Sequence, residues 1–158
     1  MKTRLLCFLM LCSFAGFAQV NISEGFESGT LPTGWTSTGF NFWNNGTLSY
    51  SGSGYTNTVA NIGSNTSLKT PNQISDGNAI DISVMARKNP GPAVSFGLAY
   101  ELHNSGNLVP ISGASENLGT AFSAYRQISG IIPAGAIPAG TTIKFVIYSW
   151  GRQVQAAM

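Results

Sequence analysis

Charged side chains are scarce in this chain, and cysteine and histidine are almost absent. Asp, Glu, Lys and Arg make up 9% of 158 residues, with two cysteines and one histidine. Cys7 and Cys12 both lie in the first eighteen residues, so the remainder offers no disulfide, thiolate metal site or cysteine nucleophile. His103 alone cannot make a typical zinc site, and there is no Gly-x-Ser-x-Gly elbow. The sequence therefore predicts a protein that is not an enzyme.

The first eighteen residues have the composition of a secretory signal peptide. A basic start precedes an apolar run over 5–17, which ends at the small-x-small site Gly16-Phe17-Ala18. This run is short for a membrane span, and no later segment is long enough for one. We expect 1–18 to be removed and 19–158 to form a single domain that is secreted or held at the cell surface.

The charge balance of the mature chain excludes a nucleic-acid partner. Of eight basic residues, Lys2 and Arg4 leave with the signal peptide, so six remain against six acidic ones. Nucleic-acid binding needs clustered Lys or Arg to displace counterions.

Glycoside hydrolysis needs two carboxylates that flank one cleft, and the sequence does not indicate such a pair. Glu24 and Glu27 would point to opposite faces of a strand, and the other carboxylates are dispersed.

The hydrophobic pattern has the period of β-strands. Apolar residues alternate with polar or small ones over 80–85, 94–102 and 143–148, as in strands with one buried face. The last of these is apolar on both faces, which favours a central position in a sheet or one under a loop. Further candidate strands are 20–27, 55–62, 67–70, 108–111 and 124–129.

Clusters of Gly, Pro, Asn and Asp separate these strands, and no helical stripe is present. Residues 100–111 are typical of a hairpin that turns at 104–107. The repeated Ile-Pro-Ala-Gly of 132–140 predicts a connection, because two close prolines exclude a central strand. The pattern predicts an all-β fold, an antiparallel β-sandwich of the jelly-roll type.

The end of the chain is short for such a sandwich. Only eight residues, 151–158, follow the predicted core strand that ends at Trp150. Sandwiches of this type usually return with one more strand beside the first. We therefore expect a C-terminally truncated domain that lacks its last strand; the alternative is a natural frayed tail.

Two glutamates near the start of the mature chain are candidate calcium ligands. Hard cations bind carboxylate and carbonyl oxygens that loops gather. Glu27 comes at a predicted strand end directly before a Gly turn, and Glu24 is the second candidate. No Asp-x-Asp-x-Asp run accompanies them, so solvated strand charges are the alternative interpretation.

Aromatic residues beside amide-rich turns are candidate ligand contacts. Trp43 precedes an Asn-Asn-Gly turn, and Tyr50 and Tyr55 flank a Ser-Gly-Ser-Gly loop. Aromatic faces next to amide groups hold sugar rings through stacking and directional hydrogen bonds. The alternative is that these rings cap the hydrophobic core, which is the role we expect for Trp35.

The order of several segments resembles a known family. The opening Phe26-Glu-Ser-Gly…Leu-Pro-x-Gly-Trp35 is similar to the start of cleaved-adhesin and choice-of-anchor J domains in secreted proteins of Bacteroidota-type bacteria, and 67–71, 82–87 and 137–145 follow in the same order. The resemblance implies a calcium-tolerant jelly roll used in adhesion or as an accessory to a larger exported protein. Family members often carry an Asp/Gly-rich loop where this chain has 36–43, and a closing Ile-Asp-Asp-like strand that is absent here.

Together these observations favour a non-catalytic extracellular adhesion or carbohydrate-binding module. Its expected partner is a glycan or a cell-surface or matrix protein, with neither nucleic acid nor a membrane span. We expect it to be part of a larger multidomain chain, with structural calcium as its candidate cofactor. The alternative is an accessory or spacer domain of a larger secreted enzyme such as a peptidase or glycoside hydrolase.

Overall fold

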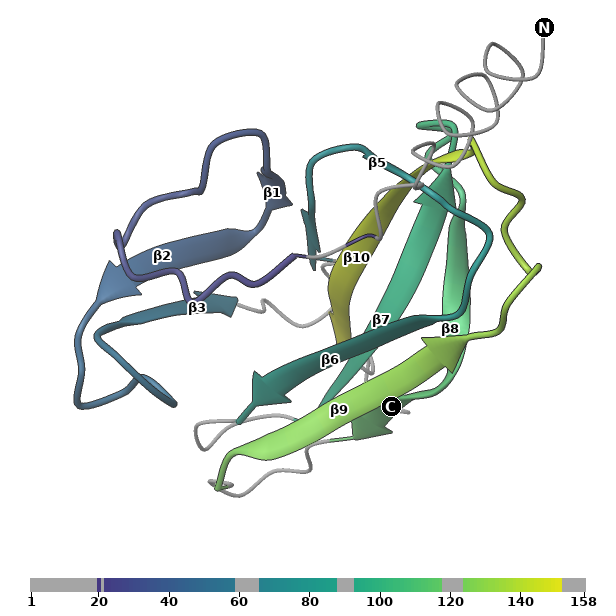
Figure 1. The fold of residues 1–158 in the computed structure, drawn as a ribbon. Helices are drawn as coiled ribbons and strands as arrows, with labels where there is room; N and C mark the ends of the chain where they lie inside the picture. Colours follow the sequence, from purple (N-terminus) through teal and green to yellow (C-terminus); the bar gives the residue numbers. More distant parts are fainter. Residues whose placement is uncertain (1–19, 21, 59–65, 88–92, 118–123, 152–158) are drawn as a thin grey trace, which may run out of the picture.

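The chain folds into antiparallel β-strands in the computed structural model, which describes residues 20, 22–58, 66–87, 93–117 and 124–151 (Figure 1). All strand pairings in these residues are antiparallel, as the sequence predicts. The strands are β1 (Thr36–Thr38), β2 (Phe40–Asn44), β3 (Gly54–Thr58), β4 (Thr66–Lys69), β5 (Gln73–Ile74), β6 (Ile80–Ala86), β7 (Val94–Leu102), β8 (Leu108–Asn117), β9 (Arg126–Ile132) and β10 (Thr142–Gly151).

One large sheet and two small sheets make up the fold. The large sheet has the order β1-β4-β10-β7-β8, and β5 also pairs with β10. In the small sheets β2 pairs with β3 and β6 pairs with β9. In Figure 1 the β6–β9 pair lies in front of β7 and β8, while the β2–β3 pair lies near β1. The large sheet therefore has one face covered by the small sheets and one outer face.

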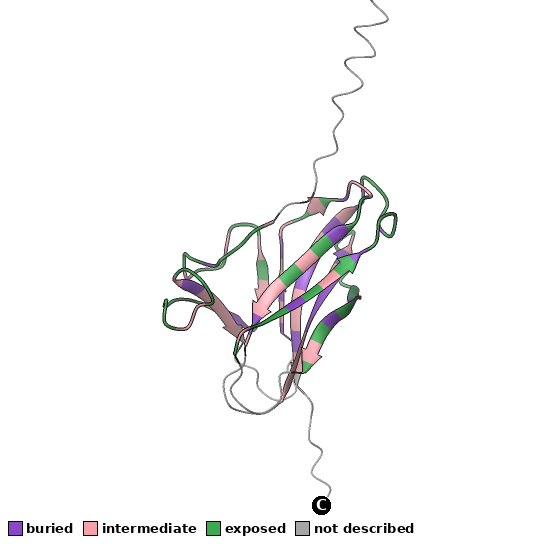
Figure 2. Cartoon of the chain, turned by 60° about the horizontal axis from the view of Figure 1, so that its bottom comes forward, coloured by how far each residue is buried: buried purple, intermediate pink, exposed green. Residues whose placement is uncertain are grey.

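The main core lies between the large sheet and the β6–β9 pair. Leu98 of β7 and Ile143 of β10 are fully buried and belong to one cluster with Ile80 of β6 and Ile132 of β9. Buried residues alternate with exposed ones along the strands, as Figure 2 shows. This alternation follows from the period of two, which sends successive side chains to opposite faces of a sheet.

A second buried cluster lies where the β2–β3 pair covers the large sheet. It contains Phe26, Phe40 of β2 and Leu68 of β4. Phe96 and Ile147 pack against both clusters, so the two parts of the core are continuous. Trp35 packs against this second cluster, with its ring 5.5 Å from that of Phe26, in the core role expected of it.

Most predicted strands are confirmed. The three alternating segments correspond to β6, β7 and β10, and the strand that is apolar on both faces, β10, lies centrally between β4 and β7. The predicted hairpin joins β7 to β8, with Glu101 opposite Leu108. The Ile-Pro-Ala-Gly repeat connects β9 to β10, as expected.

The predicted strand at 20–27 is wrong, because residues 22–27 form no strand. Phe26 has a φ of 58°, and its N–H donates to Glu24 Oε1 at 2.7 Å. This side chain-to-backbone bond and the positive φ replace the extended backbone that a strand requires. Contrary to the prediction from the sequence, Glu24 and Glu27 therefore do not point to opposite faces of a strand.

Some predictions concern residues outside the described ranges. The predicted signal peptide lies there, as do 59–62 of the predicted strand 55–62, whose described part is β3. No helix long and apolar enough to cross a membrane is found among the described residues.

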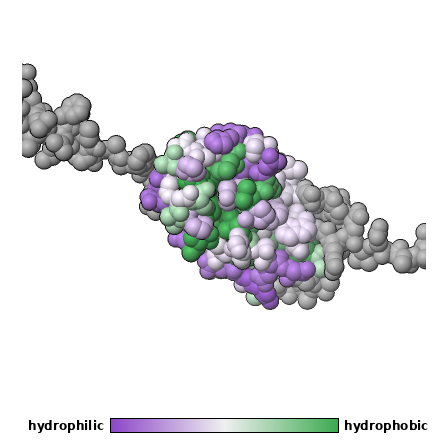
Figure 3. All heavy atoms as spheres, turned by 90° about the vertical axis from the view of Figure 1, so that its right-hand side faces the viewer, coloured by the Kyte–Doolittle hydropathy of each residue, from purple (hydrophilic) through white to green (hydrophobic). Residues whose placement is uncertain are grey.

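The side of the sandwich near β8 and β9 exposes apolar side chains among polar ones (Figure 3). Val109 of β8 and Ile131 of β9 are among the large apolar residues that are exposed. Ile131 alternates with the buried Ile132, so its exposure follows from strand geometry. Single exposed apolar residues are normal on protein surfaces and indicate no site by themselves.

Candidate functional site

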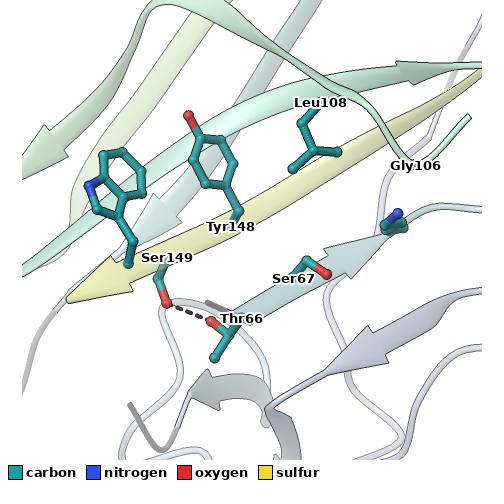
Figure 4. A pocket seen from close by; sticks show the side chains of 8 residues that line it. Thr66, Ser67, Gly106, Leu108, Tyr148 and Ser149 are labelled. Carbon is teal, nitrogen blue, oxygen red and sulfur yellow. Dashed lines mark hydrogen bonds between the residues drawn. The ribbon is translucent and has the colours of Figure 1, made fainter. Parts of the chain in front are cut away.

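The outer face of the large sheet carries a hollow with an aromatic pair at one end. Tyr148 and Trp150 of β10 alternate with the buried Ser149, so both project from the outer face. Figure 4 shows Tyr148 and Leu108 on the same side of the sheet, while Ser149 bonds with Thr66. The hollow has a volume of about 460 Å³ and is lined by Thr66, Ser67, Lys69, Gly106, Leu108, Tyr148, Ser149 and Trp150.

The two aromatic rings are parallel and their positions are supported by the sheet. The ring centroids of Tyr148 and Trp150 are 4.9 Å apart, with an angle of 15° between the ring planes. Tyr148 lies opposite Gly97 of β7, where an added Cβ would be 3.0 Å from Tyr148 Cζ and Oη. Gly97 therefore leaves room for the ring to lean across the neighbouring strand. Burial raises the pKa of the Tyr148 hydroxyl, which keeps it a neutral hydrogen-bonding group.

An ion pair occupies the other end of the same face. Lys69 Nζ donates to Glu101 Oε2 at 2.6 Å, and the two side chains are 25% and 4% exposed. The other carboxylate oxygen of Glu101 accepts the Gly106 N–H at 2.8 Å. The Lys69 hydrogen bond, which outweighs the opposing effect of burial, lowers the pKa of Glu101. Glu101 is thus a fixed anion that holds Lys69 at the hollow and ties down the β7–β8 turn.

Small apolar residues lie between the aromatic and charged ends. Val146 of β10 is opposite Lys69 on one side and Ala99 on the other, and neither Val146 nor Ala99 is exposed. Ser67 lies opposite Tyr148 and adds a hydroxyl to the lining. The face therefore combines flat aromatic surface, hydroxyl groups and one ammonium group, which are groups that contact sugars.

Two of the aromatics predicted as ligand contacts lie together on the β2–β3 pair. Trp43 is directly opposite Tyr55, and the Trp43 Nε1–H donates to Asn57 Oδ1 at 3.2 Å. Trp43 is 51% exposed. Phe40 and Phe42, which alternate with Trp43 along β2, contact the second core cluster. Trp43 and Tyr55 therefore face away from the core, and we call them, with Asn57, the hairpin face.

The third predicted aromatic, Tyr50, pairs with a residue that the sequence did not single out. Tyr50 is 60% exposed, and its ring lies 5.3 Å from that of Tyr125 in an edge-to-face contact. The Tyr125 hydroxyl donates to the Leu48 carbonyl at 2.6 Å, and Arg87 lies 4.9 Å from the Tyr125 ring centroid. These contacts fasten the loop that joins β2 and β3 to the start of β9.

The two predicted calcium ligands take part in backbone turns. Glu27 Oε2 accepts the Ser53 N–H at 2.6 Å, and the Ser53 hydroxyl and the Gly54 N–H both at 3.0 Å. These bonds, that of the Ser53 N–H above all, lower the pKa of Glu27. Glu24 accepts the N–H of Phe26. Among the described residues no three or more His, Cys, Asp or Glu side chains gather as a metal site. Calcium binding stays a prediction.

The sequence did not indicate that Tyr148 and Trp150 belong to the candidate site on the outer face. Both belong to a strand that is apolar on each face, and such a strand indicates burial on both sides. The alternation of side chains along β10 could have indicated them, because Ile147 and Ser149 lie on the covered face and Tyr148 and Trp150 therefore lie on the opposite one. The pattern of a single strand does not show which face of the sheet is open. That depends on where the two small sheets pack.

Comparison with known proteins gives structural neighbours without a sequence family. No family model and no curated protein matches the sequence. The CBM22-2 xylan-binding domain of Xyn10C from Paenibacillus barcinonensis is similar, with a TM-score of 0.57 and 17% identity over 85% of this chain and 86% of that one. The K1 cleaved adhesin domain of Lys-gingipain from Porphyromonas gingivalis W83 has a TM-score of 0.55 and 16% identity over 82% and 94%. TmCBM61, solved with β-1,4-galactotriose, has 0.54 and 15% over 81% and 84%.

At these identities the likeness establishes the fold alone. The predicted jelly-roll β-sandwich is confirmed, since the neighbours are β-sandwich domains of carbohydrate-binding and adhesin type. The predicted resemblance to cleaved adhesins holds at the level of the fold, and the relation to choice-of-anchor J domains stays a prediction.

Proposed function

We propose that this chain is a non-catalytic carbohydrate-binding domain that holds a glycan on the outer face of its large sheet. The proposal rests on the Tyr148–Trp150 pair, whose parallel rings stand at the end of a hollow that Ser67 and Lys69 also line. The flat apolar face of a sugar ring stacks on such aromatic surface, while its hydroxyls bond to the serine and the ammonium group. A xylan-binding domain and a domain solved in complex with β-1,4-galactotriose have the same fold, which supports this function.

The polar groups of the hollow favour binding over catalysis. Among the described residues that line or support it, Glu101 is the one carboxylate, and its two oxygens bond to Lys69 and Gly106. Glycoside hydrolysis needs an acid and a second carboxylate on opposite sides of the scissile bond. A single buried carboxylate that already has two donors is suited to holding Lys69 in place.

The setting of this function is extracellular in our proposal. The predicted signal peptide supports export, and two of the similar domains are described as parts of larger proteins, Xyn10C and Lys-gingipain. An accessory role beside a secreted enzyme is therefore compatible with glycan binding. Adhesion to a cell-surface or matrix protein is the second candidate, which the cleaved adhesin neighbour favours.

Affinity electrophoresis tests the proposed function. The purified protein is run through gels that contain xylan, galactan, polygalacturonate or no polysaccharide, and we expect at least one glycan to slow it. Trp150→Ala should abolish the retardation, whereas the matched variant Trp43→Ala should leave it. Normal migration in every glycan gel would contradict carbohydrate binding, and retention on immobilised matrix proteins alone would favour the adhesion candidate.

We propose separately that the chain binds a structural calcium ion. Glu27 would be the principal ligand and Glu24 the second, both near the start of the described chain. The melting temperature should then rise with added calcium and fall with chelator, and Glu27→Gln should remove this difference. A melting temperature that calcium and chelator leave unchanged would refute the calcium site without affecting glycan binding.

A further inference from the structure

Two cations lie next to one carboxylate at the charged end of the outer face, and one of them bonds to it. Lys69 is bound to Glu101 Oε2, and Lys144 of β10 lies directly opposite Glu101 in the pairing with β7. The Lys69 hydrogen bond above all, then the Gly106 N–H bond and after it the charges of Lys69 and Lys144, lower the pKa of Glu101 despite its burial. This end of the face thus has one positive charge more than it has negative ones.

Among the described residues, no carboxylate other than Glu101 bonds to Lys69 or Lys144. Glu116 forms an ion pair with Arg126, Asp76 bonds to Asn78 in the turn after β5, and Asp81 is on β6 of the covering layer. Glu24 and Glu27 bond to the turns beside the hairpin. Since the mature sequence has as many acidic as basic residues, the excess of positive charge is a local property of this face.

The Lys69 ammonium group is placed to meet a ligand. An ammonium group has three N–H donors, and the bond to Glu101 uses one of them. Lys69 lines the hollow and is partly exposed, whereas Glu101 beneath it is almost fully buried. A ligand in the hollow therefore meets the cation first. Tyr148 is two residues along β10 from Val146, the partner of Lys69, which corresponds to about 7 Å along the strand.

We propose that the glycan bound on this face is acidic, with its anionic group at Lys69 and Lys144 and a sugar ring on the Tyr148–Trp150 pair. The inference rests on the proposed carbohydrate-binding function and names its substrate class. Charge-assisted hydrogen bonds from an ammonium group to a carboxylate or sulfate are about twice as strong as neutral ones. A neutral glycan would use Lys69 for a hydroxyl and would leave Lys144 without a role in binding.

Pairs of polysaccharides with the same sugar backbone, one member anionic and one neutral, test this inference. Isothermal titration compares polygalacturonate with its methyl ester, and dextran sulfate with dextran. We expect at least a tenfold preference for an anionic member over its neutral partner, and a clear loss of that preference in high salt. Tighter binding of polygalacturonate identifies a carboxylate ligand, and tighter binding of dextran sulfate identifies a sulfate. Equal binding within each pair, or binding of neutral glycans alone, overturns the inference while the proposed function stands. Failure to bind any glycan contradicts the proposed function itself.

Variants that remove charged side chains test whether the preference for anionic glycans arises at this end of the sheet. Lys144→Gln should lower affinity for the anionic member at least threefold and leave the neutral member unchanged, because Lys144 has no bond to Glu101 that folding would lose. Lys69→Gln combined with Glu101→Gln removes the ion pair as a unit and should lower anionic affinity about tenfold. Arg126→Gln, which removes a positive charge at the Glu116 pair, is the matched control. An equal loss in Arg126→Gln and Lys144→Gln would show general attraction and overturn the assignment to this face.

Discussion

The outer face of the large sheet and the hairpin face both present aromatic rings, yet they hold them differently. Tyr148 and Trp150 stand on a central strand, stack on each other and have Gly97 beneath the tyrosine ring. Trp43 stands on a two-stranded pair, is half exposed and has one side-chain bond, to Asn57. Side chains that are ordered before binding lose less conformational entropy when a ligand arrives. We therefore expect the position of a ring in the sheet, more than its exposure, to decide which face binds the proposed glycan.

Removing both rings of the outer face should have the largest effect. We expect Tyr148→Ala combined with Trp150→Ala to weaken glycan binding at least 30-fold, about 2 kcal/mol, because aromatic anchors dominate the energy of binding sites. Isothermal titration measures the loss. Circular dichroism should show an unchanged β-fold, since neither ring belongs to the core clusters. A loss of affinity smaller than threefold would show that the outer face is not the glycan-binding site.

Breaking the ion pair should affect stability next most strongly. Glu101→Gln should lower the free energy of unfolding by about 1–3 kcal/mol, because Lys69 loses its anionic partner while glutamine can still accept the Gly106 N–H. Urea denaturation provides the measurement. The corresponding change on the hairpin, Asn57→Ala, removes one exposed bond and should alter stability by less than about 0.5 kcal/mol.

The same ion pair predicts the direction of the response to acid. The pKa of Glu101 lies below its ordinary value of 4.5 in the folded protein. Its contribution to stability is therefore complete above pH 4.5 and is lost as the pH falls through the folded-state pKa. Stability curves between pH 7 and pH 2 should fall less steeply below pH 4.5 in Glu101→Gln than in the natural protein. Parallel curves would mean that Glu101 does not contribute to acid unfolding.

Filling the space at Gly97 should produce a graded, intermediate effect. A Cβ there would be 3.0 Å from the Tyr148 ring, so Gly97→Ala should displace the ring slightly and Gly97→Val more. We expect glycan affinity to fall about twofold and about fivefold respectively, as fluorescence titration would reveal. Equal affinity in all three proteins would show that the inclination of the tyrosine ring is unimportant.

The smallest effect is expected on the hairpin face. Trp43→Ala combined with Tyr55→Ala should change affinity for the glycan of the outer face by less than threefold, because these residues lie on a separate small sheet. The titration used for the outer-face variants gives the comparison directly. If this variant abolished binding and the outer-face variant did not, the hairpin face would be the site, as the sequence alone suggested.

The sequence predicted the strands better than it predicted the faces. The period of two located β6, β7 and β10, because each side chain in a strand alternates regardless of what covers it. It missed β1, β2 and β5, of which β1 and β5 have too few residues to display a period. It wrongly extended a strand through Phe26, which has a positive φ and whose N–H bonds to the Glu24 side chain. The sequence did not predict the exposed positions of Tyr148 and Trp150, because they depend on β2, β3, β6 and β9 covering only the other face of the sheet, which is a tertiary property.

Strand β10 divides two tasks between its odd and even positions. Ile143, Phe145 and Ile147 pack into the protein, while Lys144, Tyr148 and Trp150 alternate with them on the opposite face. Substitutions at Lys144, Tyr148 and Trp150 would change the surface that we propose to bind a glycan and leave the core residues unchanged, whereas the fully buried Val146 belongs to the packing.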